Sequence, residues 1–265
     1  MKIASHSDDA TLCATFATDD MTTLDVSILT ALIFAAALLY SSVGHAGASG
    51  YIAAMALFGL APDVMKPTAL FLNILVASVT SVRFYRAGHF SWPMLWPFVI
   101  GSIPASFAGG ALQLPANIYK PLVGVVLLIG AVRLAWPSEP VATEPKPVPI
   151  VPGIMWGVGI GLLSGLTGTG GGIFLSPLLL FAGWAQTRQT GGVSAVFILV
   201  NSIAGLAGRL TTMVNLPAAL PIWAIAALAG GLLGAGLGSR RLPPMRFRQL
   251  LALVLVIAGC KLILT

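Results

Sequence analysis

The feature that most constrains this sequence is the near absence of carboxylates from its long apolar runs. Five of its eight Asp and Glu residues lie in the first 25 positions, and only Asp63, Glu139 and Glu144 follow. Charged residues make up 8% of the chain, whereas a soluble domain carries about 25%. So few charges cannot cover a water-facing surface, but they suit a lipid-facing one. We therefore predict a polytopic integral membrane protein in a lipid bilayer.

The apolar residues fall into ten runs separated by short polar or glycine-rich segments. Because a bilayer has no water to satisfy the backbone, helices are expected for such runs, and the strict alternation of a β-barrel strand is missing. The predicted fold class is all-α. The runs are 26–43, 50–61, 67–84, 93–113, 118–136, 153–167, 173–183, 192–210, 220–239 and 246–264.

Two polar segments divide the chain. Residues 1–25 are rich in Thr, Asp and Ala and lack the apolar core of a signal peptide, so we predict a disordered polar tail, with Met21 as an alternative start. Residues 137–152 (PSEPVATEPKPVPIVP) contain too many prolines to continue a helix. They form the predicted linker between a first membrane repeat, 26–136, and a second, 153–265.

The two sets of five runs resemble each other. An offset of 124 residues places Gly44, Gly47 and Gly59 on Gly168, Gly171 and Gly183. An offset of 128 places 114–134 on 242–262, with seven of the 21 positions identical. Chance similarity between apolar segments is the alternative, but the matched glycines, prolines and cations favour an internal duplication.

Orientation follows from the cations. If all ten runs cross, nine Lys and Arg residues fall on one side and four on the other, which makes the first side cytoplasmic. An odd number of segments per repeat inverts the second repeat relative to the first, an arrangement common in secondary transporters. The sequence leaves open whether 50–61 and 173–183 cross fully or are re-entrant.

Glycine-rich breaks before the two short runs are the strongest local signal. They read YSSVGHAGASGY (40–51) and SGLTGTGGGIFLSP (164–177). Glycine lets a backbone unwind, and the free N–H groups at the start of the next half-helix favour an anion. Nearby hydroxyl groups add donors. The alternative is that these glycines only permit close helix packing, which is our interpretation of the glycines at 101, 109, 230, 234 and 238.

His45 is the histidine that lies inside an apolar, glycine-rich segment. It is a candidate to donate a hydrogen bond to an anion or to carry a proton. The alternative is a neutral histidine bonded to a backbone carbonyl. Asn73 and Asn201 are candidates to bind a ligand or a neighbouring helix. Arg83 and Arg209, near run ends, either face an anion path or snorkel toward the interface, and we favour snorkelling. The predicted substrate-binding residues are Ser42, Gly44, His45, Gly47, Ser49, Asn73, Thr169, Gly170, Gly171, Gly172 and Asn201.

The sequence lacks the motifs that several functional classes require. The chain has no Walker, GxSxG, HExxH or CxxC pattern, so ATP hydrolysis, enzymatic catalysis, a cofactor and a metal site are not expected. The scattered cations form no basic face for nucleic acid. No Asp or Glu lies within any run, which disfavours a cationic substrate and suits a small anionic one.

The duplicated half, the break GHAGASG (44–50) with its second copy GTGGGIFLSP (168–177), and the LP-led closing run of each half resemble the TauE/SafE family of sulfite and sulfonate exporters. The resemblance covers about 27–264. It implies export of sulfite or small organosulfonate anions across the bacterial inner membrane by a secondary transporter, with protons as a candidate coupling ion. An anion channel and an accessory membrane subunit remain the alternatives. The exact substrate, coupling ion, direction and oligomeric state are left open.

Overall fold

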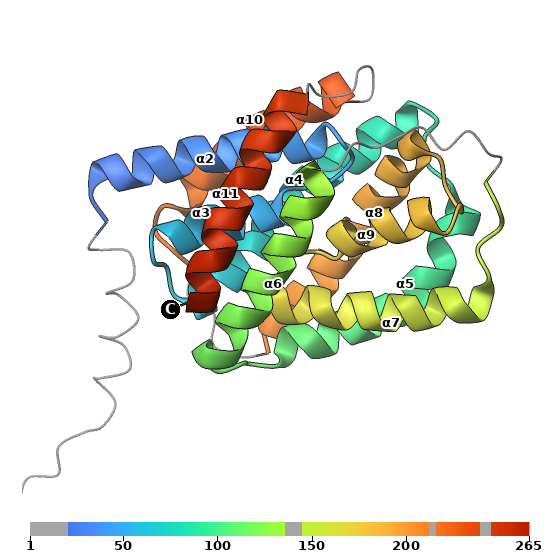
Figure 1. Cartoon of the computed structure of the whole chain (residues 1–265), viewed down its shortest axis with the longest axis horizontal. Helices are drawn as coiled ribbons and strands as arrows, with labels where there is room; N and C mark the ends of the chain where they lie inside the picture. The colour runs from blue at the N-terminus through green and yellow to red at the C-terminus, as the bar shows by residue number, and fades with distance from the viewer. Residues whose placement is uncertain (1–20, 136–144, 212–215, 239–244, 265) are drawn as a thin grey trace, which may run out of the picture.

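The computed structural model describes residues 21–135, 145–211, 216–238 and 245–264, which form ten α-helices and no strand (Figure 1). Each helix coincides with one of the ten predicted apolar runs, so the all-α membrane fold is confirmed. The helices are α2 (Thr23–Ser41), α3 (Ala48–Leu57), α4 (Pro62–Arg86), α5 (Trp92–Ala111), α6 (Ala116–Ala135), α7 (Ile150–Thr167), α8 (Gly172–Phe181), α9 (Thr187–Arg209), α10 (Leu220–Gly238) and α11 (Met245–Leu264).

Six of the described helices are long and apolar enough to cross a membrane, namely α2, α4, α5, α7, α9 and α10. The helices after the two glycine breaks, α3 and α8, have ten residues each. At 1.5 Å per residue such a helix is about 15 Å long, roughly half of the hydrocarbon core of a bilayer. Neither α3 nor α8 therefore crosses a membrane by itself.

The pairing of helices repeats between the two halves. Helix α5 packs along α7 as α10 packs along α2, and α4 pairs with α9 as α6 pairs with α11. In Figure 1, α2 begins at the left whereas α7 begins at the right, so these two helices run in opposite directions in that view. Inversion of the second repeat in the membrane remains a prediction.

Glycines bring these paired helices into close contact. A Cβ atom on Gly101 or Gly109 of α5 would overlap or crowd the backbone of α7 at Ile154 or Leu162. The glycines of α10 (Gly230, Gly234 and Gly238) stand in the same relation to the backbone of α2. The prediction that these glycines serve helix packing is confirmed, because only a residue without a side chain permits so short a separation.

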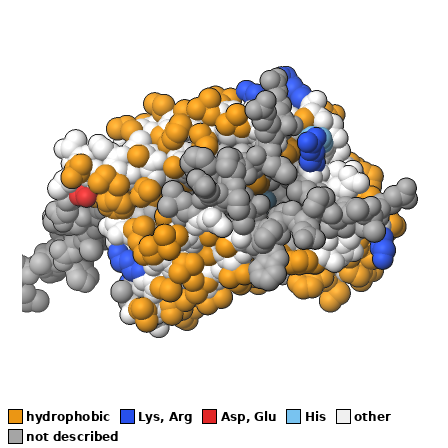
Figure 2. Space-filling view, turned by 45° about the horizontal axis from the view of Figure 1, so that its top comes forward, with side chains coloured by type: hydrophobic (Ala, Val, Ile, Leu, Met, Phe, Trp, Pro, Cys, Tyr) orange, Lys and Arg blue, Asp and Glu red, His pale blue; other side chains and the backbone are white. Residues whose placement is uncertain are grey.

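The apolar core has two parts. One surrounds α3 and draws on α2, α4, α6, α10 and α11, and the other surrounds α8 and draws on α5, α7 and α9. Large apolar side chains also cover the outside, as Figure 2 shows for one face, where Lys and Arg lie near the edges. An apolar exterior over an apolar interior is expected for a protein solvated by lipid.

Two predicted boundaries move by a few residues. Helix α2 begins at Thr23, inside the predicted tail, because Thr22 and Asp25 form a capping box. Helix α7 begins at Ile150, inside the predicted linker. Pro152 then lies in the first helical turn, where its missing N–H removes no helical hydrogen bond. Residues 1–20 and 136–144 lie outside the described residues, so most of the predicted tail and linker is not tested.

Candidate functional site

The first glycine break joins the end of α2 to the start of α3. Gly44 and Gly47 have φ values of +84° and +108°, a region that residues with a Cβ rarely adopt. Gly47 is the N-cap of α3. A Cβ atom on Gly44 would overlap the backbone of Gly191 in α9. The glycines of this break therefore serve both the sharp turn and the contact with α9.

The second glycine break joins α7 to α8 with the same geometry. Gly168 caps α7 with φ +83°, and Gly171 is the N-cap of α8 with φ +80°. Gly170 adds a third positive value, +77°. A Cβ atom on Gly170 would lie 2.6 Å from Asn73 Nδ2, and one on Gly172 would lie 3.1 Å from His45 Cδ2. This break is thus in contact with the two most polar predicted residues.

His45 links the first break to the second. Its Nε2 lies 3.0 Å from the Gly172 carbonyl oxygen and 2.9 Å from the Ser176 hydroxyl in α8. Its Nδ1 lies 3.3 Å from the Val43 carbonyl oxygen. Ser176 continues the chain of contacts to the Ser194 hydroxyl of α9 at 2.8 Å. The imidazole therefore lies against the first turn of α8, where helical N–H groups lack partners within the helix.

Asn73 contacts the second break from α4. Its Nδ2 donates to the Thr169 carbonyl oxygen at 3.4 Å and to the Ser202 hydroxyl at 3.3 Å. Its Oδ1 has no hydrogen-bond partner among the described residues although the side chain is fully buried. The Thr169 hydroxyl lies 2.9 Å from that of Thr167. A buried polar atom without a partner is uncommon and marks this side chain as a candidate for ligand contact.

Three predicted residues make local contacts instead. The Ser42 hydroxyl donates to the Leu39 carbonyl, and the Ser49 hydroxyl donates to the Tyr40 hydroxyl at 2.7 Å. The Asn201 Nδ2 donates to the Phe197 carbonyl within α9, while its Oδ1, like that of Asn73, has no hydrogen-bond partner among the described residues. These contacts tie each side chain to its own segment. The arrangement brings together His45, Asn73, Thr169 and the glycines 170–172, and it leaves Ser42, Ser49 and Asn201 outside this group.

Sequence reasoning missed the serines that complete the group, Ser176, Ser194 and Ser202. All three are buried in apolar helices, and a single serine in such a run gives a weak signal. Ser176 stands inside the second motif, GTGGGIFLSP, and is the one that the motif could have revealed. Snorkelling of Arg209 is wrong, because this side chain is 4% exposed. Arg83 is exposed, as expected.

The chemistry available here is that of hydrogen bonding and a single imidazole. Among the described residues, no group of three or more His, Cys, Asp or Glu side chains is placed to hold a metal ion. Hydroxyl, amide and imidazole donors with the N-termini of α3 and α8 suit an oxyanion. The two breaks lie in contact with each other through His45, Gly172 and Ser176.

Comparison with known proteins gives a consistent result. A family model described as sulfite exporter TauE/SafE matches residues 29–262. A probable membrane transporter protein of Sinorhizobium fredii is 44% identical over 234 residues, which cover 87% of this chain and 95% of that protein. A probable membrane transporter protein of Methanocaldococcus jannaschii is 28% identical over 223 residues, covering 78% and 82%. No solved structure matches the chain.

Proposed function

This chain belongs to the sulfite exporter TauE/SafE family of membrane transporters, and from that premise we propose that it exports sulfite or a small organosulfonate anion across the bacterial inner membrane. The observation that carries the proposal is the contact between the two glycine breaks through His45, Gly172 and Ser176. It joins the two halves of the chain at the residues that offer donors to an anion.

His45 is the proposed proton carrier. Both of its ring nitrogens lie within hydrogen-bonding distance of backbone carbonyl oxygens, those of Val43 and Gly172. A carbonyl oxygen only accepts, and a neutral imidazole carries one N–H. The protonated ring therefore satisfies both carbonyls, and it places a positive charge beside a segment that holds no carboxylate.

Ser176 offers the neutral ring an alternative. When Nε2 loses its proton, the Ser176 hydroxyl donates to it, and Ser194 lies within reach of Ser176 in turn. The bond to Gly172 is then lost. Protonation of His45 thus bonds the first break to the Gly172 carbonyl at the start of α8, and deprotonation exchanges that bond for the one from the Ser176 hydroxyl, one turn further along α8. In the proposed cycle an anion and a proton share this site, and separation of the breaks opens it to one side at a time.

The test is flux of labelled sulfite into proteoliposomes that hold the purified chain, with and without an imposed pH gradient. Unlabelled taurine and other sulfonates serve as competitors. Saturable flux that responds to the gradient supports a proton-coupled transporter, and the competition pattern narrows the substrate. No flux of sulfite or of any competitor from folded protein would remove the proposal and favour an accessory subunit. Unsaturable conductance without proton coupling would favour a channel.

A matched pair of variants locates the coupling. His45→Gln keeps a polar side chain but cannot carry a proton, so its flux should become insensitive to the gradient. Ser49→Ala removes a buried hydroxyl from the same break, one that bonds Tyr40 and is outside the His45 group. It should keep the response of wild type. Equal responses in both variants would exclude His45 as the proton carrier.

A further inference from the structure

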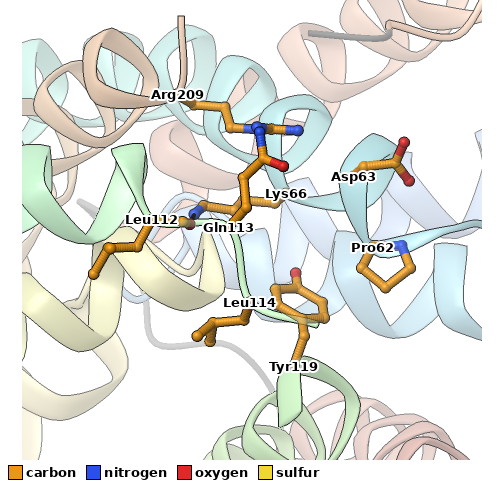
Figure 3. Close-up of a pocket in the computed structure, with 8 residues that line it drawn as sticks. All are labelled: Pro62, Asp63, Lys66, Leu112, Gln113, Leu114, Tyr119 and Arg209. Atoms are coloured by element: carbon orange, nitrogen blue, oxygen red, sulfur yellow. Dashed lines mark hydrogen bonds between the residues drawn. The ribbon is translucent and has the colours of Figure 1, made fainter. Parts of the chain in front are cut away.

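A small cavity lies beside the second glycine break, away from His45 (Figure 3). It is lined by residues at the start of α4, in the loop between α5 and α6, in the first turn of α6, and at the end of α9. The cavity has a volume of about 70 Å³. On the same measure one water molecule needs roughly 10–15 Å³. The cavity therefore has room for several waters or one small polyatomic ion.

Two buried cations line this cavity, Lys66 from α4 and Arg209 from α9. Lys66 is 5% exposed and Arg209 is 4% exposed. Asp63 is the acidic residue of the lining, and it is exposed at the start of α4. Cations are costly to bury and are usually retained for a reason. With two buried cations facing one exposed carboxylate, the lining favours an anion.

The roles of the two cations differ. The Lys66 ammonium donates to the carbonyl oxygens of Gly109, Gly110 and Leu112 at 3.0–3.1 Å. It thereby neutralises the negative end of α5, which would otherwise repel an anion. Arg209 is the other cation of the lining (Figure 3). A guanidinium presents planar paired donors that match an oxyanion, so Arg209 is the cation suited to direct contact.

The cavity borders the backbone of the second break. A Cβ atom on Gly168 would lie 3.3 Å from Lys66 Cα, and the Tyr119 hydroxyl donates to the Thr167 carbonyl at 3.1 Å. Thr167 contacts Thr169, whose carbonyl accepts from Asn73. The backbone of the second break therefore connects the edge of the cavity to the Asn73 contacts of the proposed site.

We infer that this cavity is a second anion site, which holds a small oxyanion such as sulfite beside Arg209 on its way to or from the glycine breaks. The inference rests on the proposed function for the identity of the anion. The cavity lies at the end of the helix pair α4 and α9 for which the cation count predicts the non-cytoplasmic side. It serves as the outer binding site of the transport path.

The test is direct binding, measured by isothermal titration calorimetry on the full chain in nanodiscs of zwitterionic lipid, with sulfite and then sulfate as probes. Loss of one charged hydrogen-bonding partner is expected to raise the Kd of Arg209→Gln by about tenfold to hundredfold. Asp63→Asn removes the exposed negative charge and should lower the Kd by about twofold to threefold. Arg86→Gln, which changes an exposed arginine at the other end of α4, is the matched control and should bind as wild type.

The outcomes separate the two proposals. Unchanged binding in Arg209→Gln would overturn the second site, and so would no change in Asp63→Asn. If Arg209→Gln does not fold, Arg209→Lys carries the test, since it keeps the charge but loses the planar donors and should weaken binding by a smaller factor. Arg209-dependent binding without any sulfite flux would support this site and contradict the proposed transport. Sulfite flux without Arg209-dependent binding would support the proposed transport and contradict this second site.

Discussion

The two glycine breaks share one backbone design and carry different chemistry. Gly44 and Gly47 of the first break, like Gly168 and Gly171 of the second, have positive φ, and each break leads into a ten-residue helix. The first break contributes an imidazole at position 45, whereas the second has Thr169 at the matching position. The two halves thus share the arrangement of a glycine break before a short helix, while the side chains that can hold a proton or a charge differ between them.

The helices that pack on the two breaks also differ in their side chains. Lys66 is the fifth residue of α4 and Gly191 is the fifth residue of α9. Lys66 packs against Gly168, and Gly191 packs against Gly44. Equivalent positions therefore hold a cation at one end of the helix pair and a glycine at the other. The cavity lined by Lys66 and Arg209 lies at the first of these ends, and the glycine at the other end offers no charge to an anion.

The largest expected effect is on folding, from Gly44→Ala compared with Gly168→Ala. Both glycines have positive φ, so alanine costs about 1–3 kcal/mol at either position. At Gly44 the new Cβ would also overlap the Gly191 backbone, whereas at Gly168 the closest atom is the Lys66 carbonyl oxygen at 3.1 Å. We expect Gly44→Ala to lose most of its folded protein and Gly168→Ala to melt several degrees below wild type. Thermal melting in detergent with size-exclusion chromatography measures both, and equal losses would contradict the tighter contact at Gly44.

Much of this fold could be predicted from the sequence because lipid imposes strong rules on composition. Apolar runs without carboxylates and paired glycine motifs were sufficient to place all ten helices. The site was harder, because burial decides which polar side chains meet. The sequence singled out His45 and Asn73 but could not show that Ser49 and Asn201 bond locally. It also could not show that Arg209 turns inward, since the same residue type at a run end often snorkels.

A second comparison concerns the matched positions of the breaks, His45 and Thr169. His45→Gln should lower proton-driven sulfite flux by about tenfold to hundredfold, because its charged hydrogen bonds to the second break are lost. Thr169→Val removes a hydroxyl that bonds Thr167 but leaves the carbonyl that Asn73 contacts. It should change flux by less than about threefold. Initial rates in proteoliposomes decide the point, and an equal fall in both variants would mean that the two breaks act alike.

A third comparison sets Asn73 against Asn201, which are both fully buried with an Oδ1 that lacks a described partner. Asn73 bonds the second break, whereas Asn201 bonds its own helix. One neutral hydrogen bond contributes about 0.5–1.5 kcal/mol, so Asn73→Ala should lower flux by about fivefold. Asn201→Ala should lower the melting temperature but keep the flux per folded molecule. A larger loss of flux in Asn201→Ala would mean that the asparagine in contact with the anion is the one on α9 and not the one on α4.

The smallest effect concerns pH and the end of α9 that faces the first break. His89, in the loop between α4 and α5, places its carbonyl against Gly192, next to the Gly191 that packs on Gly44. Burial, with a smaller contribution from Arg188, lowers the pKa of His89 below its usual 6.5. The unfolded chain therefore takes up this proton at a higher pH than the folded one. The neutral His89 ring therefore contributes to the stability of the folded protein. This contribution is fully present above about pH 6.5 and is lost as the pH falls toward the pKa of the folded state.

His89→Gln removes this titration without adding charge. Between pH 7.5 and 5.5 the melting temperature of wild type should therefore fall slightly more than that of the variant. Because the His89 carbonyl packs on Gly192 and Gly168 packs on Lys66, Gly168→Ala should leave this difference unchanged. Sulfite flux of His89→Gln should keep its response to a pH gradient, which separates loop stability from proton coupling at His45. If His89→Gln also lost the response to the gradient, His89 would contribute to proton coupling. The difference in chemistry between the two breaks would then not depend on His45 alone.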